Sequence, residues 1–190
     1  SSFAKTAAGQ IGVVRNGGIA KLDLGELEGT LSERCKGIEH VLKVPGLQAQ
    51  AVADITTRIW EKFVFLVGLS GSTTTMRETI GPIRSNSRSR RFLSELMRET
   101  VAVGRALGVA LPVDFAEQRL AFVDNLPEQM TSSMHHDLKA GKRLEVSWLS
   151  GGVAQLGERA GVATPMNRAV WEILTLQEAG SGPAQAGPHR

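Results

Sequence analysis

The spacing of apolar residues changes along the chain near position 54. Before that position, apolar and polar residues alternate over short stretches, as at Ala20, Leu22 and Leu24. A period of two is typical of a half-buried β-strand. After that position, apolar residues recur every three or four places, which is typical of an amphipathic helix. The pattern therefore predicts a short β-rich segment over residues 1–53 and a helical segment over residues 54–178.

The β-rich segment carries turn and capping signals between its predicted strands. Asn16-Gly17 favours a tight hairpin turn, which predicts antiparallel strands on its two sides. Ser32 is a suitable N-cap for a short amphipathic helix, and Pro45 marks the end of that helix. Residues 47–52 alternate again and predict one more half-buried strand.

The helical segment begins with a helix that is apolar on nearly every side. Asp54 is a suitable N-cap, and Ile59, Phe63 and Val67 follow at fourfold spacing. Apolar residues all round a helix are typical of a central position in a bundle. Residues 179–190 have too few apolar side chains to repay the entropy of ordering, so we expect them to be disordered. Further helices are predicted over residues 87–107, 112–126, 144–160 and 165–177.

Composition and charge limit the classes of protein to which the chain belongs. Its 190 residues, 42% of them hydrophobic, are enough for one sizeable domain. The 22 basic and 19 acidic residues leave a net charge of +3, so charge does not indicate a nucleic-acid partner. The single cysteine, Cys35, makes an internal disulfide impossible and favours a reducing compartment, the cytoplasm. No apolar run approaches the roughly 18–20 residues of a membrane helix, so we expect no membrane partner.

A possible metal site is suggested by the adjacent residues His135, His136 and Asp137. Adjacent histidines of a helix point to different sides, and the sequence has no C-x-x-C or H-x-x-x-H pair to accompany them. A polar helix start explains the three residues without a ligand. We therefore predict no metal.

Four sequence motifs, taken together and in this order, resemble a known family. They are "GELEG" followed by "SER", "WEKFVF", "SSMHHDLKAGKRLEV" and "GVATPMNRAVWEIL". The combination is similar to ketopantoate reductase (2-dehydropantoate 2-reductase) over nearly the whole chain, from about Ile11 to Leu176. The resemblance implies the NADPH-dependent reduction of a 2-oxo acid, ketopantoate or an analogue, to the 2-hydroxy acid in pantothenate biosynthesis.

The resemblance also implies a mainly α fold with two parts. Residues 1–53 correspond to the last strands and a helix of a truncated Rossmann domain. Residues 54–178 correspond to an all-α substrate and dimerisation domain of the 6-phosphogluconate-dehydrogenase C-terminal-like type. The chain begins at Ser1 rather than at a methionine, which suggests that further residues precede it. The alternative is a non-enzymatic helical module that serves dimerisation or ligand binding and has lost the nucleotide domain.

Lys62 stands at the head of the apolar helix and has two interpretations. A lysine near the start of a buried helix can extend its amine to the surface. An ammonium group can also stabilise the negative oxygen that forms when a carbonyl accepts hydride, and then donate its proton. The "WEK" motif places Lys62 at the family's catalytic lysine, and we expect Trp60, Phe63 and Val64 to desolvate it.

Glu145 and Ser133 match two further positions of the family. The resemblance gives Glu145 a catalytic role beside the lysine and contacts with both substrate and cofactor, whereas its alternative role is a favourable interaction with a helix N-terminus. Ser133 matches the serine that hydrogen-bonds the substrate carboxylate, whereas its alternative role is a helix N-cap.

Leu66 and Ser70 depart from the family, which usually has asparagines one and two turns after the lysine. Both residues are expected to line the substrate site. A leucine in place of an amide changes which substrate fits, because a site that hydrogen-bonds a hydroxyl discriminates strongly for it. The 2-oxo acid is therefore open, and Ser70 or Ser72 is a candidate to replace the missing amides.

The expected cofactor, NADPH, lacks its usual fingerprint in this sequence. No G-x-G-x-x-G follows a first strand, and no G-x-x-x-x-G-K-[ST] occurs. Apart from Glu145, the chain offers no predicted cofactor-binding residue. We therefore expect the main nucleotide-binding domain to lie upstream of Ser1, and the resemblance implies a homodimer.

Overall fold

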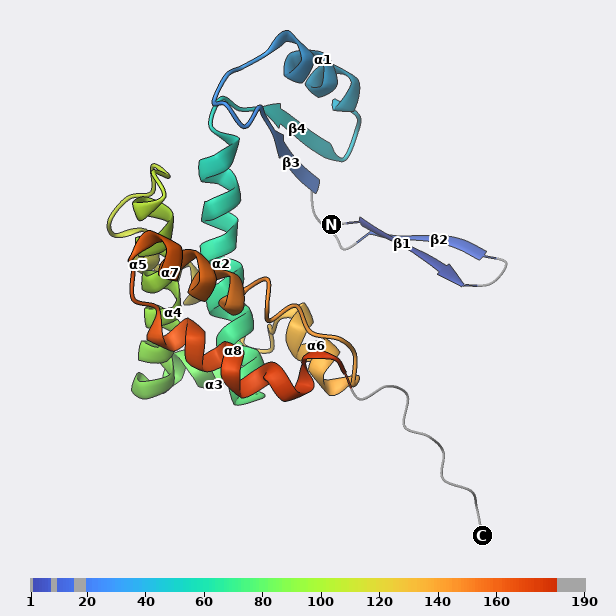
Figure 1. Cartoon of the computed structure of the whole chain (residues 1–190). Coiled ribbons are helices and arrows are strands. Elements are labelled where there is room, and N and C mark those ends of the chain that lie inside the picture. Colours follow the sequence, from blue (N-terminus) through green and yellow to red (C-terminus); the bar gives the residue numbers. More distant parts are fainter. Residues whose placement is uncertain (1, 8–9, 16–19, 181–190) are drawn as a thin grey trace. The chain divides into compact units, whose positions relative to one another are not determined.

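The computed structural model describes residues 2–7, 10–15 and 20–180 (Figure 1). The described chain divides into two compact units, Ser1–Ile59 and Trp60–Arg190. The predicted Asn16-Gly17 turn and most of the tail that was expected to be disordered lie outside the described residues.

The first unit contains two pairs of strands. The first pair joins residues 2–7 to residues 10–15 in antiparallel fashion, so among the described residues the strand before Asn16-Gly17 does not pair with the strand after it, as the predicted hairpin would require. The second pair is parallel and aligns Ala20 with Leu47, so the expectation that the strand beginning at Ala20 pairs only in antiparallel fashion is wrong. A parallel pair requires a long crossover, which the intervening helix provides, whereas alternation alone does not identify a strand's partner. The elements are β1 (Ser2–Ala7), β2 (Gln10–Arg15), β3 (Ala20–Leu24), α1 (Glu33–Leu42) and β4 (Leu47–Ala51).

Both predicted helix caps at this end of the chain are confirmed. The Ser32 hydroxyl accepts a hydrogen bond from the amide of Cys35 at 3.1 Å and begins α1. The Asp54 carboxylate accepts a hydrogen bond from the amide of Thr57 at 2.9 Å at the start of the next helix. Each side chain satisfies an amide that has no partner within its own helix.

The second unit is built from helices. The predicted helices are confirmed, with two corrections: the helix expected over residues 112–126 spans Phe115–Val123, and the helix expected to start at 144 starts at Ser150. The amide of Leu144 donates to the carbonyl of Glu178 at 2.9 Å, and residues 146–149 form turns before the helix begins. The helices are α2 (Ile55–Met76), α3 (Ile80–Ser85), α4 (Ser87–Ala106), α5 (Phe115–Val123), α6 (Ser133–Lys139), α7 (Ser150–Ala160) and α8 (Pro165–Glu178).

Helix α2 is central in its C-terminal half, where every residue from 67 to 74 is buried (Figure 1). Two glycines allow α4 to approach closely. A Cβ atom on Gly68 would lie 2.6 Å from Cγ of Met97, and one on Gly71 would lie 2.9 Å from Cδ1 of Leu96. Larger side chains at these positions would push the helices apart.

None of the helices in the described residues is long and apolar enough to span a membrane.

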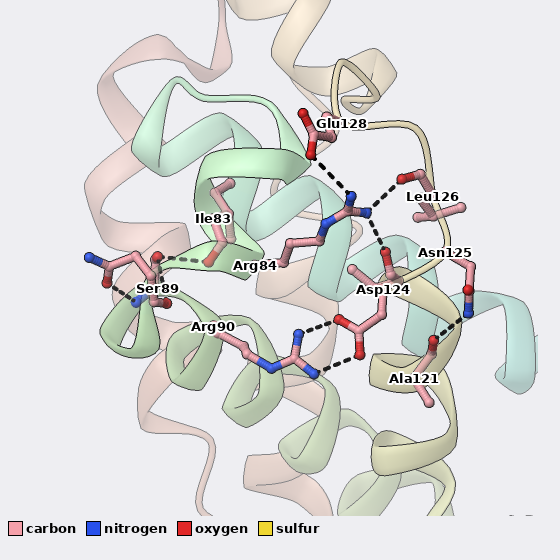
Figure 2. Close-up of polar contacts among 11 residues, drawn as sticks. Ile83, Arg84, Ser89, Arg90, Ala121, Asp124, Asn125, Leu126 and Glu128 are labelled. Atoms are coloured by element: carbon pink, nitrogen blue, oxygen red, sulfur yellow. Dashed lines mark hydrogen bonds and ion pairs between the residues drawn. The ribbon is translucent and has the colours of Figure 1, made fainter.

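Arginine side chains connect α3 and α4 to the end of α5 (Figure 2). Arg84 donates to the carbonyls of Val123 at 3.1 Å and Leu126 at 2.5 Å. Arg90 donates to the Asp124 carboxylate at 2.9 Å, and this hydrogen bond lowers the pKa of Asp124. The Arg84 side chain is 17% exposed and that of Arg90 33% exposed, so the two contacts differ in burial.

These two arginines predict unequal stability losses. We expect Arg84→Met to lower the free energy of unfolding by about 1–3 kcal/mol, because it leaves a carbonyl at the end of α5 without its donor. We expect Arg90→Met to cost less than about 1 kcal/mol, because exposed ion pairs contribute little. Urea denaturation of both variants measures the difference. Equal losses would contradict the structural role assigned to Arg84.

Candidate functional site

Lys62, Leu66 and Ser70 lie on one face of α2, because residues four apart are neighbours on a helix. On this face the Lys62 side chain is exposed, the Leu66 side chain is half-buried, and Ser70 is only 3% exposed. The face therefore begins at the surface of the helical unit and ends in its core. Eight residues of helix separate Lys62 from Ser70, which is about 12 Å along the axis.

The expectation that apolar neighbours desolvate Lys62 is wrong for this chain. Val64 is fully buried, and Trp60 lies where a Cβ atom on Gly104 would be 2.8 Å from its ring. These two residues are each two positions from Lys62, or about 200° around the helix, so they face α4 while Lys62 faces solvent. Val64 and the ring of Trp60 thus lie on the other side of the helix from the lysine.

Ser133 is the first residue of α6, and its side chain is exposed. The cap of this helix is the preceding residue, Ser132, whose hydroxyl accepts from the amide of His135 at 3.1 Å. The Ser132 hydroxyl also lies 2.9 Å from that of Thr73 on α2. The start of α6 is thereby held against α2, three residues beyond Ser70, and Ser133 is free of the capping role.

Glu145 lies in the segment between α6 and α7, with its side chain exposed. Its carbonyl accepts from the amides of Trp148 and Leu149, both at 3.0 Å, and so forms the turn that precedes α7. Ser150 follows this turn, and its Oγ lies 3.4 Å from where a Cβ atom on Gly71 would be. Glu145 is thus connected to the same buried part of α2 as Ser133, and it does not lie in the first turn of α7.

The structure brings some of the predicted site residues together and not others. The start of α6 contacts α2 at Thr73, and the first residue of α7, Ser150, lies beside Gly71 of α2. Within the described part of the chain, no hydrogen bond or ion pair joins Lys62 to Glu145 or Ser133. Lys62 stands about 16 Å along the helix axis from the contact at Thr73, since eleven residues of helix separate them.

Ser72 is not available to replace a missing amide. Its side chain is fully buried, and its hydroxyl donates to the carbonyl of Gly68 at 2.7 Å. Ser70, the other candidate serine, is also buried at 3% exposed, and its place in the site stays a prediction.

His135 is a site-adjacent residue whose environment the sequence did not indicate. It is 1% exposed, and its Nδ1 lies 2.6 Å from the Thr131 hydroxyl. Burial lowers its pKa, and the positive charges of Lys139 and His136 act in the same direction. The residues that the structure describes include no group of three or more His, Cys, Asp or Glu side chains placed to hold a metal ion.

A cavity of about 330 Å³ lies beyond the end of α2, away from the predicted site. None of the five predicted site residues lines it. Its walls come from the end of α2, from α6 with the turn that follows, and from the end of α8. The lining residues are Arg77, Leu138, Lys139, Gly141, Lys142, Leu176, Gln177 and Gly180.

Comparison with known proteins matches most of the chain to one family. The sequence profile described as "Ketopantoate reductase PanE/ApbA C terminal" matches residues 54–178. A "2-dehydropantoate 2-reductase" from Archaeoglobus fulgidus is 30% identical over 158 residues, which cover 83% of this chain and 52% of the relative. The chain thus spans about half the length of the curated relatives that it matches.

Solved structures resemble the chain over a similar extent. The 2-dehydropantoate 2-reductase from Methylococcus capsulatus has a TM-score of 0.79 and 29% identity, over 93% of this chain and 56% of that one. A D-mandelate dehydrogenase with NADH and anilino(oxo)acetate has a TM-score of 0.74 and 20% identity, over 83% of this chain and 66% of that one. The second likeness concerns the fold alone.

The burial of His135 predicts a loss of stability on acidification. Its pKa in the folded chain lies below the ordinary value of 6.5. The unfolded chain therefore binds more protons, and stability falls as the pH drops below about 6.5 toward the folded pKa. We expect the urea midpoint to decrease between pH 7.5 and pH 5.5, with a smaller decrease in His135→Gln. His136→Gln, which alters an exposed neighbour, is the control, and an equal pH dependence in both variants would contradict the assignment.

Proposed function

Because the chain belongs to the ketopantoate reductase family, we propose that it forms the C-terminal part of an NADPH-dependent enzyme that reduces a 2-oxo acid to the 2-hydroxy acid. The observation that carries the proposal is the face of α2. Lys62 of the "WEK" motif lies on this face with Leu66 and Ser70, and the start of α6 is hydrogen-bonded to the same helix at Thr73.

Lys62 is the proposed proton donor. Hydride addition to C2 of a 2-oxo acid converts the carbonyl to an alkoxide, and the ammonium group stabilises that oxygen and gives it a proton. The side chain is exposed in this chain, so the site must be closed by another part of the enzyme. The nucleotide-binding domain, whose fingerprint this sequence lacks, is the proposed cover and brings the nicotinamide ring to the substrate.

Ser133, Ser70 and Leu66 are the proposed substrate contacts. Ser133 is exposed beside the end of this face and is suited to donate a hydrogen bond to the substrate carboxylate. Leu66 presents an apolar group in the middle of the face, which favours a substrate with fewer hydroxyl groups at that point. Glu145, on the turn that precedes α7, is the proposed contact with both the cofactor and the lysine.

The cofactor and assembly follow from the same proposal. Reduction requires a hydride donor, and NADPH is the one that the family resemblance implies. A homodimer is supported by exposed apolar side chains such as Trp148, which is 76% exposed.

A cytoplasmic location is supported by the single unpaired thiol of Cys35. A non-enzymatic module is not favoured, because the family match extends across the whole helical region.

The role of Lys62 is tested by substitution in the complete enzyme. We expect Lys62→Ala to reduce kcat for NADPH oxidation with a 2-oxo acid by roughly 10²–10⁴-fold, the usual contribution of a positioned proton donor. The free energy of unfolding should change by less than about 0.5 kcal/mol, because the side chain is exposed. Lys139→Ala removes an exposed lysine elsewhere in the helical unit and should retain activity. Full turnover by Lys62→Ala would remove the lysine from the mechanism.

The role of Leu66 is tested by comparing substrates. Leu66→Asn should raise kcat/KM for a hydroxylated 2-oxo acid relative to its deoxy analogue by about tenfold or more, because the amide provides a partner for the hydroxyl. Leu66→Ala is the control, since it removes the apolar side chain without adding a hydrogen-bonding group. If the substrate ranking is the same in both variants, Leu66 does not face the substrate.

A further inference from the structure

Two buried hydroxyl groups join α6 to α2 at a point close to the proposed site. Ser132 is 5% exposed and Thr73 is fully buried, and their oxygens lie 2.9 Å apart. The two residues are distant in sequence, so this hydrogen bond is a tertiary link. A second α2 hydroxyl, that of Thr74, lies 3.5 Å from Ser132 Oγ, at the limit for a hydrogen bond.

The neighbouring groups determine the direction of this hydrogen bond. Thr73 Oγ1 lies 2.7 Å from the carbonyl oxygen of Leu69, which can only accept, so the Thr73 proton is already used. Ser132 must therefore donate to Thr73. Ser132 Oγ in turn accepts from the amide of His135 at 3.1 Å. The result is a continuous series of three hydrogen bonds that runs from the first turn of α6 to the backbone of α2.

We propose that Ser132 and Thr73 are positioning residues for substrate binding, and this inference rests on the proposed function. Their hydrogen bond sets where α6 begins relative to α2. Ser133, the next residue, has an exposed side chain and no side-chain hydrogen bond within the described residues, so its location depends on this start point. The pair therefore fixes the proposed carboxylate-binding hydroxyl against the helix that carries Lys62.

The properties of α6 make such a link necessary. The helix has seven residues, and helices of this length are marginal in water without tertiary contacts. Met134 and His135 are buried and contribute packing, but apolar contacts are non-directional. A hydrogen bond between two buried hydroxyls restricts both distance and angle, and each hydroxyl would be costly to bury without its partner. The link therefore specifies the location of α6 more narrowly than packing does.

The kinetic test uses the complete enzyme and separates KM from kcat. We expect Ser132→Ala and Thr73→Val each to raise KM for the 2-oxo acid by about 3- to 10-fold, the effect of one hydrogen bond, with kcat changed by less than about twofold. Thr73→Ser keeps the hydroxyl and should retain the original KM. The proposal is overturned if KM is unchanged in Ser132→Ala and Thr73→Val, or if kcat alone falls.

Thr100→Val provides a matched control for Thr73→Val. Thr100 is also fully buried, and its hydroxyl donates to the carbonyl of Leu96 at 2.8 Å, the same bond within a helix that Thr73 makes. It has no hydroxyl partner on another helix in the described chain. Its replacement should lower stability by less than Thr73→Val does, because no hydroxyl on another helix loses its partner, and it should not raise KM. Equal KM values for Thr73→Val and Thr100→Val would show that the Thr73 effect is structural only.

A second measurement does not depend on the proposed function. In this chain, Ser132→Ala and Thr73→Val should accelerate amide hydrogen exchange over residues 133–136, which include the His135 amide, whereas Thr100→Val should not. Unchanged exchange would mean that the hydroxyl link does not hold α6, which overturns the inference. If the unsubstituted complete enzyme reduces no 2-oxo acid, the proposed function and the substrate role of the link both fail, while the exchange data still report whether the link exists.

Discussion

The close packing of α2 against α4 is the constraint on which the rest of the helical unit depends. Gly68 and Gly71 remove the side chains that would separate the two helices, so the half of α2 that contains them is buried on every side. The segment that carries Ser133 is hydrogen-bonded to this half of the helix through Thr73, and Ser150, five residues after Glu145, lies beside Gly71. The proposed substrate contacts are thus arranged around a helix that has little freedom to move.

The same constraint explains how a hydroxyl-rich sequence can occupy the core. The buried run after Leu69 contains small polar residues where a core helix usually has large apolar ones. Ser72 and Thr73 donate to carbonyls one turn earlier in their own helix, so their burial leaves no donor unsatisfied. Small side chains also permit the close approach of neighbouring helices. Thr73 then has a lone pair available for a partner from outside α2, and Ser132 takes that position.

The sequence predicts much of this fold, and the limits of that prediction have physical causes. Helical periodicity locates the long helices, and the caps at Ser32 and Asp54 are correct, because both are local signals. The parallel pairing of β3 with β4 was not predicted, because a strand's own alternation does not specify its neighbour. The start of α7 was placed too early, because a tertiary hydrogen bond to the end of α8 fixes that entry.

The sequence indicates which residues form the candidate site, but it does not indicate the surroundings of their side chains. The motif places Lys62, yet the apolar residues beside it in sequence face the other side of the helix and leave it exposed. Two adjacent serines, Ser132 and Ser133, are equivalent as cap candidates in the sequence, and only the structure separates the cap from the exposed hydroxyl. In both cases the direction in which the side chain points in the folded chain, rather than its residue type, decides its environment.

The most direct test of the central claim is to map where a 2-oxo acid binds on this chain. In a titration of the isotope-labelled complete enzyme with a panel of 2-oxo acids, followed by NMR, the account predicts saturable shifts in residues 62–70 of α2 and 132–136 at the start of α6. Shifts confined to the cavity around Arg77, Lys139 and Lys142, or no saturable shifts in the face of α2, would contradict it.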